Sequence, residues 1–202
     1  QRQKTFHGGF IILGRMLIHH RFAHRLLSKT ARIVLVGTFN PETPENTADF
    51  FYGRVQNHLW TLLPGAFGHS SLKKKGKEEK EQFMHRYKIE FTDVITAVEV
   101  EKPDDYRDDY IDGCVVEWTD VIGQLQELPD LEKVCVTRKS FSGIPHIRKR
   151  LQEIESYCHE HGICFHYLIT PARGYTAAKQ VEWDAFFNGS LHKSSPFIPS
   201  KG

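Results

Sequence analysis

Amide and aromatic side chains gather shortly after the first strongly apolar stretch of the chain. Residues 37–41 read Gly-Thr-Phe-Asn-Pro, and Phe51, Tyr52, Asn57 and Trp60 follow soon after them. An aromatic face can stack on a planar base, and an Asn side chain can orient a water molecule or read a hydrogen-bonding edge. Exposed backbone amides can stabilise a developing anion. These residue types therefore suit a pocket that binds a base and acts on it.

The elements that must position these residues follow an alternating pattern. Residues 32–36 form an apolar run typical of a buried strand, and similar short runs recur between amphipathic segments of helical length. We expect strands at 32–36, 90–98, 133–137 and 163–169, and helices at 56–63, 79–87, 118–128, 144–161 and 177–187. This order predicts βα units and a mostly parallel sheet covered on both faces. A ligand is then expected beyond the carboxyl ends of the strands, in the loops after Val36 and Ile169.

The two ends of the chain are expected to differ in character. Apolar residues recur at helical spacing among basic ones over residues 10–28, which predicts an amphipathic helix with a positive outer face. We therefore describe 1–28 as an N-terminal helical segment and 188–202 as a tail. A Pro-Gly pair at 64–65 is expected to end the helix at 56–63.

The composition places limits on the class of protein. The chain has 202 residues, of which 40% are apolar and 26% charged, and this predicts a single globular domain over 1–202. Its longest candidate membrane span, residues 10–27, is interrupted by arginines and histidines, so we expect no membrane partner. Four cysteines, mostly in apolar runs, favour buried thiols in a reducing compartment, and hence a cytoplasmic protein, which we expect to be a monomer. The net charge is only +2, so any nucleic-acid binding must depend on local clusters.

Two stretches together carry a family resemblance. Residues 34–41 read Val-Leu-Val-Gly-Thr-Phe-Asn-Pro, and residues 51–60 read Phe-Tyr-Gly-Arg-Val-Gln-Asn-His-Leu-Trp. They resemble the first motif region of the uracil-DNA glycosylase superfamily, above all the mismatch-specific uracil and thymine-DNA glycosylases and their hypoxanthine-active relatives. The turn at 37–41 has one residue more than the Gly-x-Asn-Pro of that group.

Further segments extend the resemblance toward the C-terminus. Residues 168–173, Leu-Ile-Thr-Pro-Ala-Arg, are similar to the family element that probes the minor groove and helps to expel the base. Weaker similarities are found at 91–94, which resembles the family's Thr-Asp-Val strand, and at 134–137.

The resemblance implies a fold, an activity and a set of roles. The fold is a three-layer α/β/α arrangement with a central, mostly parallel four-stranded sheet. The activity is that of a monofunctional DNA glycosylase of base-excision repair, which hydrolyses the N-glycosidic bond of a flipped deaminated or mismatched base, with uracil as the first candidate. Asn40 would hold the attacking water, Tyr52 and Phe39 would stack on the base, and Asn57 would read its polar edge. No cofactor is implied.

Other residues near the motifs offer alternatives or DNA contacts. Glu42 and Asp49 could activate water more strongly than an amide if their loop folds inward, and Asp49 is therefore a second catalytic candidate. The resemblance directs Thr170 and Pro171 toward DNA. The basic candidates for phosphate contacts are Arg54, Lys139, Arg148, Arg173 and the lysines at 73–75.

Several simpler interpretations remain open. An Asn-Pro pair after a strand is often only a turn, and Tyr52 and Trp60 could be core aromatics. The cysteines and histidines at 158–166 match no standard zinc pattern, so no metal is expected. A protein of the same fold with altered catalysis, which only binds nucleic acid or nucleotides, is the main alternative function. An unrelated nucleotide enzyme is disfavoured because the chain has no glycine-rich phosphate motif.

Overall fold

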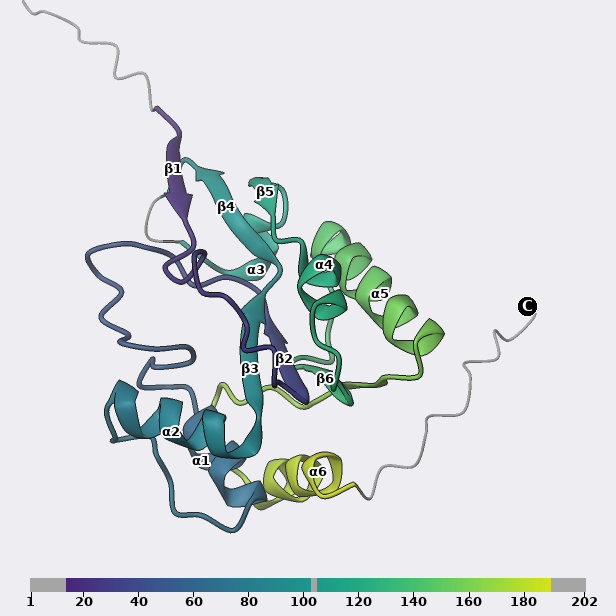
Figure 1. Cartoon of the computed structure of the whole chain (residues 1–202). Helices are drawn as coiled ribbons and strands as arrows, with labels where there is room; N and C mark the ends of the chain where they lie inside the picture. Colours follow the sequence, from purple (N-terminus) through teal and green to yellow (C-terminus); the bar gives the residue numbers. More distant parts are fainter. Residues whose placement is uncertain (1–13, 103–104, 190–202) are drawn as a thin grey trace, which may run out of the picture.

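The computed structural model describes residues 14–102 and 105–189, which form two sheets and the helices that cover them (Figure 1). The larger sheet is parallel, with strand order β3-β2-β6-β7, and the smaller is antiparallel, with order β1-β4-β5. The strands are β1 (Met16–His19), β2 (Ile33–Gly37), β3 (Ile89–Asp93), β4 (Ile95–Val100), β5 (Val115–Trp118), β6 (Lys133–Val136) and β7 (Cys164–Tyr167). The helices are α1 (Leu59–Ala66), α2 (Lys77–Tyr87), α3 (Asp108–Ile111), α4 (Val121–Gln126), α5 (Pro145–Glu160) and α6 (Ala177–Phe187).

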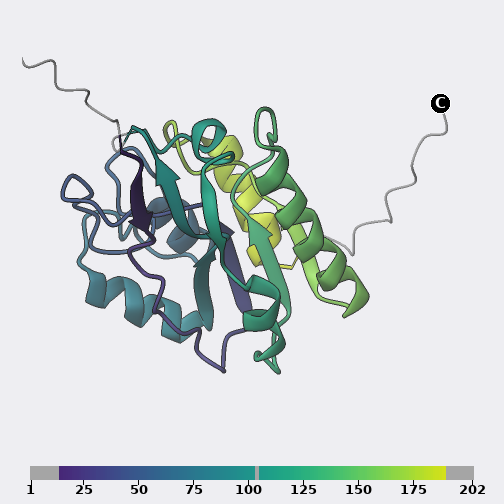
Figure 2. The same ribbon diagram turned by 90° about the horizontal axis from the view of Figure 1, so that it is seen from above.

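Side chains of β2 alternate between two separate cores, as the period of a strand requires. Val34 and Val36 pack with apolar residues of α4 and α5, whereas Ile33 and Leu35 pack with those of α1, α2 and α6. Viewed from above, α2 and α5 lie on opposite sides of the strands (Figure 2). The predicted three-layer α/β/α fold with a four-stranded parallel sheet is therefore confirmed.

The N-terminal part of the chain differs from the prediction. Residues 1–13 lie outside the described part, but Met16–His19 is a strand that pairs antiparallel with β4, so the predicted helix over 10–28 is wrong there. The apolar residues of this segment do not form a buried helical face. Ile18 is buried in the strand, whereas Met16 and Leu17 are exposed. The backbone instead gains hydrogen bonds from a partner strand far away in sequence. Residues 190–202, most of the predicted tail, also lie outside the described part.

The predicted strand at 90–98 is two strands that belong to different sheets. β3 ends at Asp93, and after Val94 the chain continues as β4 in the antiparallel sheet. The predicted helix at 118–128 is shorter than expected, because Trp118 completes β5 and Asp120 caps α4 by accepting a hydrogen bond from the N–H of Gly123 at 2.9 Å.

Helix α1 continues past the proline that was expected to end it. Pro64 lies inside the helix, which runs to Ala66. Proline has no N–H to donate to the carbonyl of Trp60 one turn earlier. That carbonyl instead accepts hydrogen bonds from the N–H of Leu72 at 2.8 Å and the hydroxyl of Ser71 at 3.2 Å. The following loop thus satisfies the acceptor that the proline leaves open, and the helix is not interrupted.

Helix α5 receives its N-terminal cap from a distant residue. The carboxylate of Asp112, which is buried, accepts hydrogen bonds from the N–H groups of His146 at 3.1 Å and Ile147 at 2.7 Å. This contact joins the first turn of α5 to the segment that follows α3. None of the helices in the described ranges is both long and apolar enough to cross a membrane.

Candidate functional site

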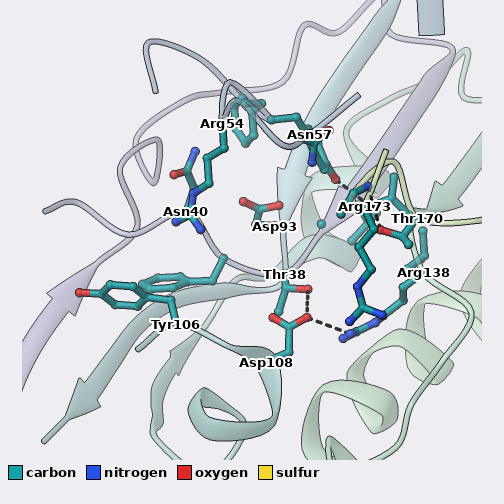
Figure 3. A pocket seen from close by; sticks show the side chains of 18 of the residues that line it. Thr38, Asn40, Arg54, Asn57, Asp93, Tyr106, Asp108, Arg138, Thr170 and Arg173 are labelled. Carbon is teal, nitrogen blue, oxygen red and sulfur yellow. Dashed lines mark hydrogen bonds and ion pairs between the residues drawn. The ribbon is translucent and has the colours of Figure 1, made fainter. Parts of the chain in front are cut away.

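A pocket of about 430 Å³ lies beyond the carboxyl ends of the parallel strands, where the sheet topology predicts a ligand site. Its wall comes from the connection between β2 and α1, from the end of β3, from the segment between β4 and α3 with the start of α3, and from the loops after β6 and β7. The residues with side chains or backbone at the pocket include Thr38, Phe39, Asn40, Tyr52, Arg54, Asn57, Asp93, Tyr106, Asp108, Thr137, Arg138, Thr170 and Arg173. Most of these are labelled in Figure 3.

Most of the residues expected from the sequence line this one pocket. Phe39, Asn40, Tyr52, Asn57, Arg54, Thr170 and Arg173 all do so. Pro171 is buried and does not line the pocket, but its carbonyl accepts a hydrogen bond from the N–H of His58 at 2.9 Å. The loop after β7 is thereby joined to the start of α1.

Tyr52 lies deep in the pocket wall in a left-handed backbone conformation, with φ of 55°. Its hydroxyl shares a hydrogen bond of 3.1 Å with the hydroxyl of Thr137, and its ring is tilted against Phe91 at a centroid distance of 5.6 Å. Burial, followed by the negative charge of Asp93, raises the pKa of Tyr52 well above its ordinary value. The phenol is therefore neutral and can act as a donor.

Asn40 is buried at the pocket wall and is held by a second amide. The side chain of Asn46 donates to Oδ1 of Asn40 at 2.6 Å and to the carbonyl of Pro41 at 2.7 Å. The Oδ1 atom of Asn46 in turn accepts from the N–H of Ala48 at 3.3 Å. This network fixes the plane of the Asn40 amide. In Figure 3 the Asn40 side chain lies at one side of the pocket, next to Arg54.

Asn57 and Phe39 complete the amide and aromatic set. The Oδ1 atom of Asn57 accepts from the N–H of Leu59 at 2.9 Å, so its NH₂ group remains for a ligand. The Phe39 ring lies beside that of Tyr106, tilted, at a centroid distance of 6.2 Å. Tyr106 thus adds an aromatic ring that the sequence analysis did not identify.

The alternative carboxylates lie outside the pocket. The Asp49 side chain is half exposed and pairs with Lys80 at 3.3 Å, while Glu42 pairs with Arg21 at 3.4 Å. Neither carboxylate lines the pocket. The loop does not fold inward at these two positions, which was the condition for either of them to activate water.

The pocket contains an acidic group, Asp93, that was not among the predicted site residues. Asp93 ends β3 and lies with its carboxylate 2.6 Å from Nε2 of His20, which follows β1. Both side chains are buried. The sequence signal was the Thr-Asp-Val segment at 92–94, which contains the end of β3, but nothing local linked Asp93 to a histidine 73 positions earlier.

A second acidic group, Asp108, faces the pocket from α3. It pairs with Arg138 at 2.9 Å and accepts a weak hydrogen bond from the Thr38 hydroxyl at 3.5 Å. Burial raises the pKa of Asp108; the charge of Arg138 opposes this effect and that of Asp93 adds to it. The Nε and Nη1 atoms of Arg138 are buried, and no group within residues 14–102 and 105–189 forms a hydrogen bond with them. Arg138 therefore retains donors for an anionic ligand.

The other basic candidates are distributed unevenly around the pocket. Arg54 and Arg173 line it and are exposed, and Arg173 adopts a left-handed conformation with φ of 61°. Lys139 also lines it and pairs with Glu182 at 2.6 Å. Arg148 lies on α5 over the ring of Phe141 and does not line the pocket, nor do the lysines at 73–75.

A buried lysine of α6 is hydrogen-bonded to the backbone of the loop after β7. Nζ of Lys179, in α6, donates to the carbonyls of Ala172 at 2.6 Å and Gly174 at 2.9 Å.

In the described ranges no cluster of three or more histidine, cysteine or acidic residues could hold a metal ion.

Comparison with known proteins gives a relationship at the level of fold. No family model matches the chain, and no curated protein sequence matches it. Among solved structures, the chain is similar to the solution structure of a putative uracil DNA glycosylase from Methanosarcina acetivorans, with a TM-score of 0.57 and 20% sequence identity. The alignment covers 82% of this chain and 94% of that protein. The chain thus has the α/β fold of that protein over most of its length.

Proposed function

We propose that this protein is a DNA glycosylase that hydrolyses the N-glycosidic bond of a deaminated or mismatched base flipped out of DNA. The observation that carries this proposal is the convergence of stacking and amide side chains in one pocket at the carboxyl edge of the sheet. Phe39, Asn40, Tyr52 and Asn57 all come from the long connection between β2 and α1 and line the same space. The similarity in fold to a protein described as a putative uracil DNA glycosylase supports it.

The size and walls of the pocket suit a single base. A volume of about 430 Å³ is at the lower end of the range for small-molecule sites. Aromatic side chains bind any base through its π-face, and each stacking contact contributes about 1–3 kcal/mol. Tyr52 and Phe39 are the stacking candidates, and the free NH₂ group of Asn57 is a donor for the base edge.

The reaction requires a positioned water molecule and stabilisation of the departing base. Asn40 is the residue we assign to the water, because its amide plane is fixed by Asn46 and it lines the pocket. An amide is a weak general base, so such an enzyme depends on stabilising the leaving group. Backbone N–H groups of the loop after β2 and the neutral hydroxyl of Tyr52 are suited to that task.

The anionic part of the substrate has its own partners. Arg138 has buried N–H groups at the pocket that no described residue uses, and Arg173 lies exposed at the same pocket. We assign both arginines to phosphates next to the flipped nucleotide, because one guanidinium group can donate two parallel hydrogen bonds to the oxygens of a phosphate. Thr170 and Arg54 line the same pocket, and we expect them to contact the DNA next to the flipped nucleotide.

The proposal is tested by abasic-site formation on labelled duplexes that contain uracil, hypoxanthine, xanthine or mismatched thymine. We expect strand cleavage after alkali for at least one of these bases and none for an undamaged duplex. If none of the modified duplexes is cleaved but all are bound, the protein is instead a binding protein of the same fold, which is the alternative considered from the sequence.

A further inference from the structure

We propose that a second cleft, beside the base pocket, binds the base of the neighbouring nucleotide in the same DNA strand. The protein thus holds two adjacent unpaired nucleotides, with the target base in the first compartment and its neighbour in the second. This inference rests on the proposed function for the identity of the target, and it adds a contact away from the bond that is cleaved.

The second cleft shares a wall with the base pocket. It has a volume of about 320 Å³, which is large enough for a small ligand. Four residues line both cavities, namely Ala48, Gly53, Arg54 and Tyr106. Most of the other lining residues belong to the connection between β2 and α1, and Thr43 and Asn46 among them are buried. The two cavities are therefore neighbouring compartments.

The shared wall lies along the expected path of the strand. In Figure 3, Arg54 and Tyr106 lie on the same side of the base pocket as Asn40, opposite Arg138 and Arg173. A strand that places one phosphate at Arg138 and Arg173 and inserts its target base between the two sides leaves past Arg54. The next nucleotide then lies at the second cleft.

Arg54 is suited to the phosphate between the two nucleotides. Its side chain is exposed, and it forms no hydrogen bond or ion pair with any group within residues 14–102 and 105–189. It lines both compartments, and the phosphodiester that joins two nucleotides lies between their bases. A guanidinium group can donate two parallel hydrogen bonds to phosphate oxygens.

Tyr106 offers an aromatic ring to the second compartment. It is half-buried in the segment between β4 and α3, and its ring contacts that of Phe39 at a centroid distance of 6.2 Å. Phe39 lines the base pocket but not the second cleft. An aromatic ring can stack on any base, because every base has a π-face. The two rings therefore provide a stacking surface for each compartment.

The remaining side chains favour a base over a second phosphate in this cleft. Glu45 is exposed and is the acidic residue among the described residues that line the cleft. Its charge repels a phosphate, which is therefore kept at Arg54. Val55 also lines the cleft and is 85% exposed, so it offers apolar surface to an uncharged ring.

The two compartments together define a class of substrate. A duplex must give up a second base pair to fill both of them. Taking a base out of the stack costs free energy, and least when that base is already unpaired. Single-stranded or locally unpaired DNA is therefore the substrate that uses both compartments.

The test measures the binding of short single-stranded oligonucleotides by fluorescence anisotropy at one salt concentration. Each contains a central 2′-fluorinated uracil nucleotide, whose glycosidic bond resists hydrolysis. A tetrahydrofuran abasic site replaces the base on its 5′ side, on its 3′ side or on neither side. We expect loss of the base on one side to raise Kd by about tenfold, as for one lost stacking contact, and loss on the other side to have little effect.

Three variants identify the residue that binds the neighbouring base. Tyr106→Leu should bring the ratio of the two Kd values close to one, because the neighbouring base no longer has a ring to stack on. Tyr106→Phe retains the ring and should keep the wild-type ratio. Tyr157→Leu is the matched control, because Tyr157 is a half-buried tyrosine on α5 that lines neither cavity. An error in the folded fraction of a preparation cancels in this ratio, so partial unfolding does not obscure the result.

Equal Kd values for the three oligonucleotides with the wild-type protein would overturn the inference, as would an unchanged ratio in Tyr106→Leu. Absence of binding to all three would overturn it as well. None of these outcomes decides the proposed function, which is tested separately by abasic-site formation. The expected ratio in a protein that cleaves none of the modified bases would reject the proposed function and retain the second base site.

Discussion

The side-chain amide of Asn46 donates to Oδ1 of Asn40 at 2.6 Å, within the loop that follows β2. Both donors of the Asn46 amide are used, one on Asn40 and one on the carbonyl of Pro41, and its own oxygen accepts from Ala48. Any rotation of the Asn46 side chain would therefore break one or more of these hydrogen bonds. The orientation of Asn40 is therefore determined by the protein before any substrate binds.

Replacing Asn40 by Ala should reduce kcat for abasic-site formation by about two orders of magnitude or more, because the water loses its positioning group. Asn46→Ala should reduce kcat less and leave KM nearly unchanged, since it frees Asn40 without removing it. Asp49→Ala is the control and should retain the wild-type rate. The assignment of Asn40 would be wrong if the Asp49 variant lost activity and the Asn40 variant did not.

Tyr52→Ala should lose about 1–3 kcal/mol of transition-state stabilisation, measured as kcat/KM, because the base loses a stacking surface. Tyr52→Phe retains the ring and removes the hydroxyl, with its hydrogen bond to Thr137 and its donor for the departing base, so it should lose less than Tyr52→Ala. Similar losses in both variants would indicate that the hydroxyl, and not the ring, carries the function of Tyr52.

Arg138→Gln should weaken DNA binding and lower the slope of log affinity against log salt concentration by about one, the value for one lost phosphate contact. The matched control is Arg150→Gln, because Arg150 is a partly exposed arginine on α5 that pairs with Glu153. Fluorescence anisotropy at several salt concentrations gives the slope. An unchanged slope in Arg138→Gln would contradict a phosphate contact.

Asp108 should make the protein less stable as the pH rises. Its pKa is raised in the folded state, so the folded protein binds this proton more tightly than the unfolded chain does. The free energy of unfolding should therefore fall as pH rises from the ordinary value of Asp, about 3.9, through the raised value. Asp108→Asn should lack this decline. The free energy of unfolding of the variant, measured in urea, should therefore rise relative to that of the wild type as the pH increases. A difference independent of pH would contradict the raised pKa.

Asp112→Ala should lower the free energy of unfolding by about 1–2 kcal/mol, because the first turn of α5 loses two hydrogen bonds to a buried cap. Asp109→Ala removes an exposed carboxylate from the same region and should change stability by less than about 0.5 kcal/mol. Equal effects of the two variants on chemical denaturation would show that the cap contributes nothing of its own.

The sequence predicted the features that depend on residues close together in the chain, and it missed those that depend on residues far apart in it. Strand β2 and helix α5 have strong local patterns and were predicted from the residues, whereas the roles of Tyr52 and Asn57 were predicted from one short motif that carries the family resemblance. Strand β1 was not found, because an edge strand with one buried side chain depends on β4 for its structure. The pairs His20–Asp93 and Asp108–Arg138 were missed for the same reason, since each joins segments that only the fold brings together.

If the protein binds DNA as proposed, the lysine that supports the loop after β7 has a consequence for the thermodynamics of that binding. Lys179 joins α6 to the carbonyls of Ala172 and Gly174, and Pro171 is joined to the start of α1. A loop that is already ordered loses little conformational entropy when it enters a groove. More of the favourable contact energy then remains to offset the unstacking of the flipped base.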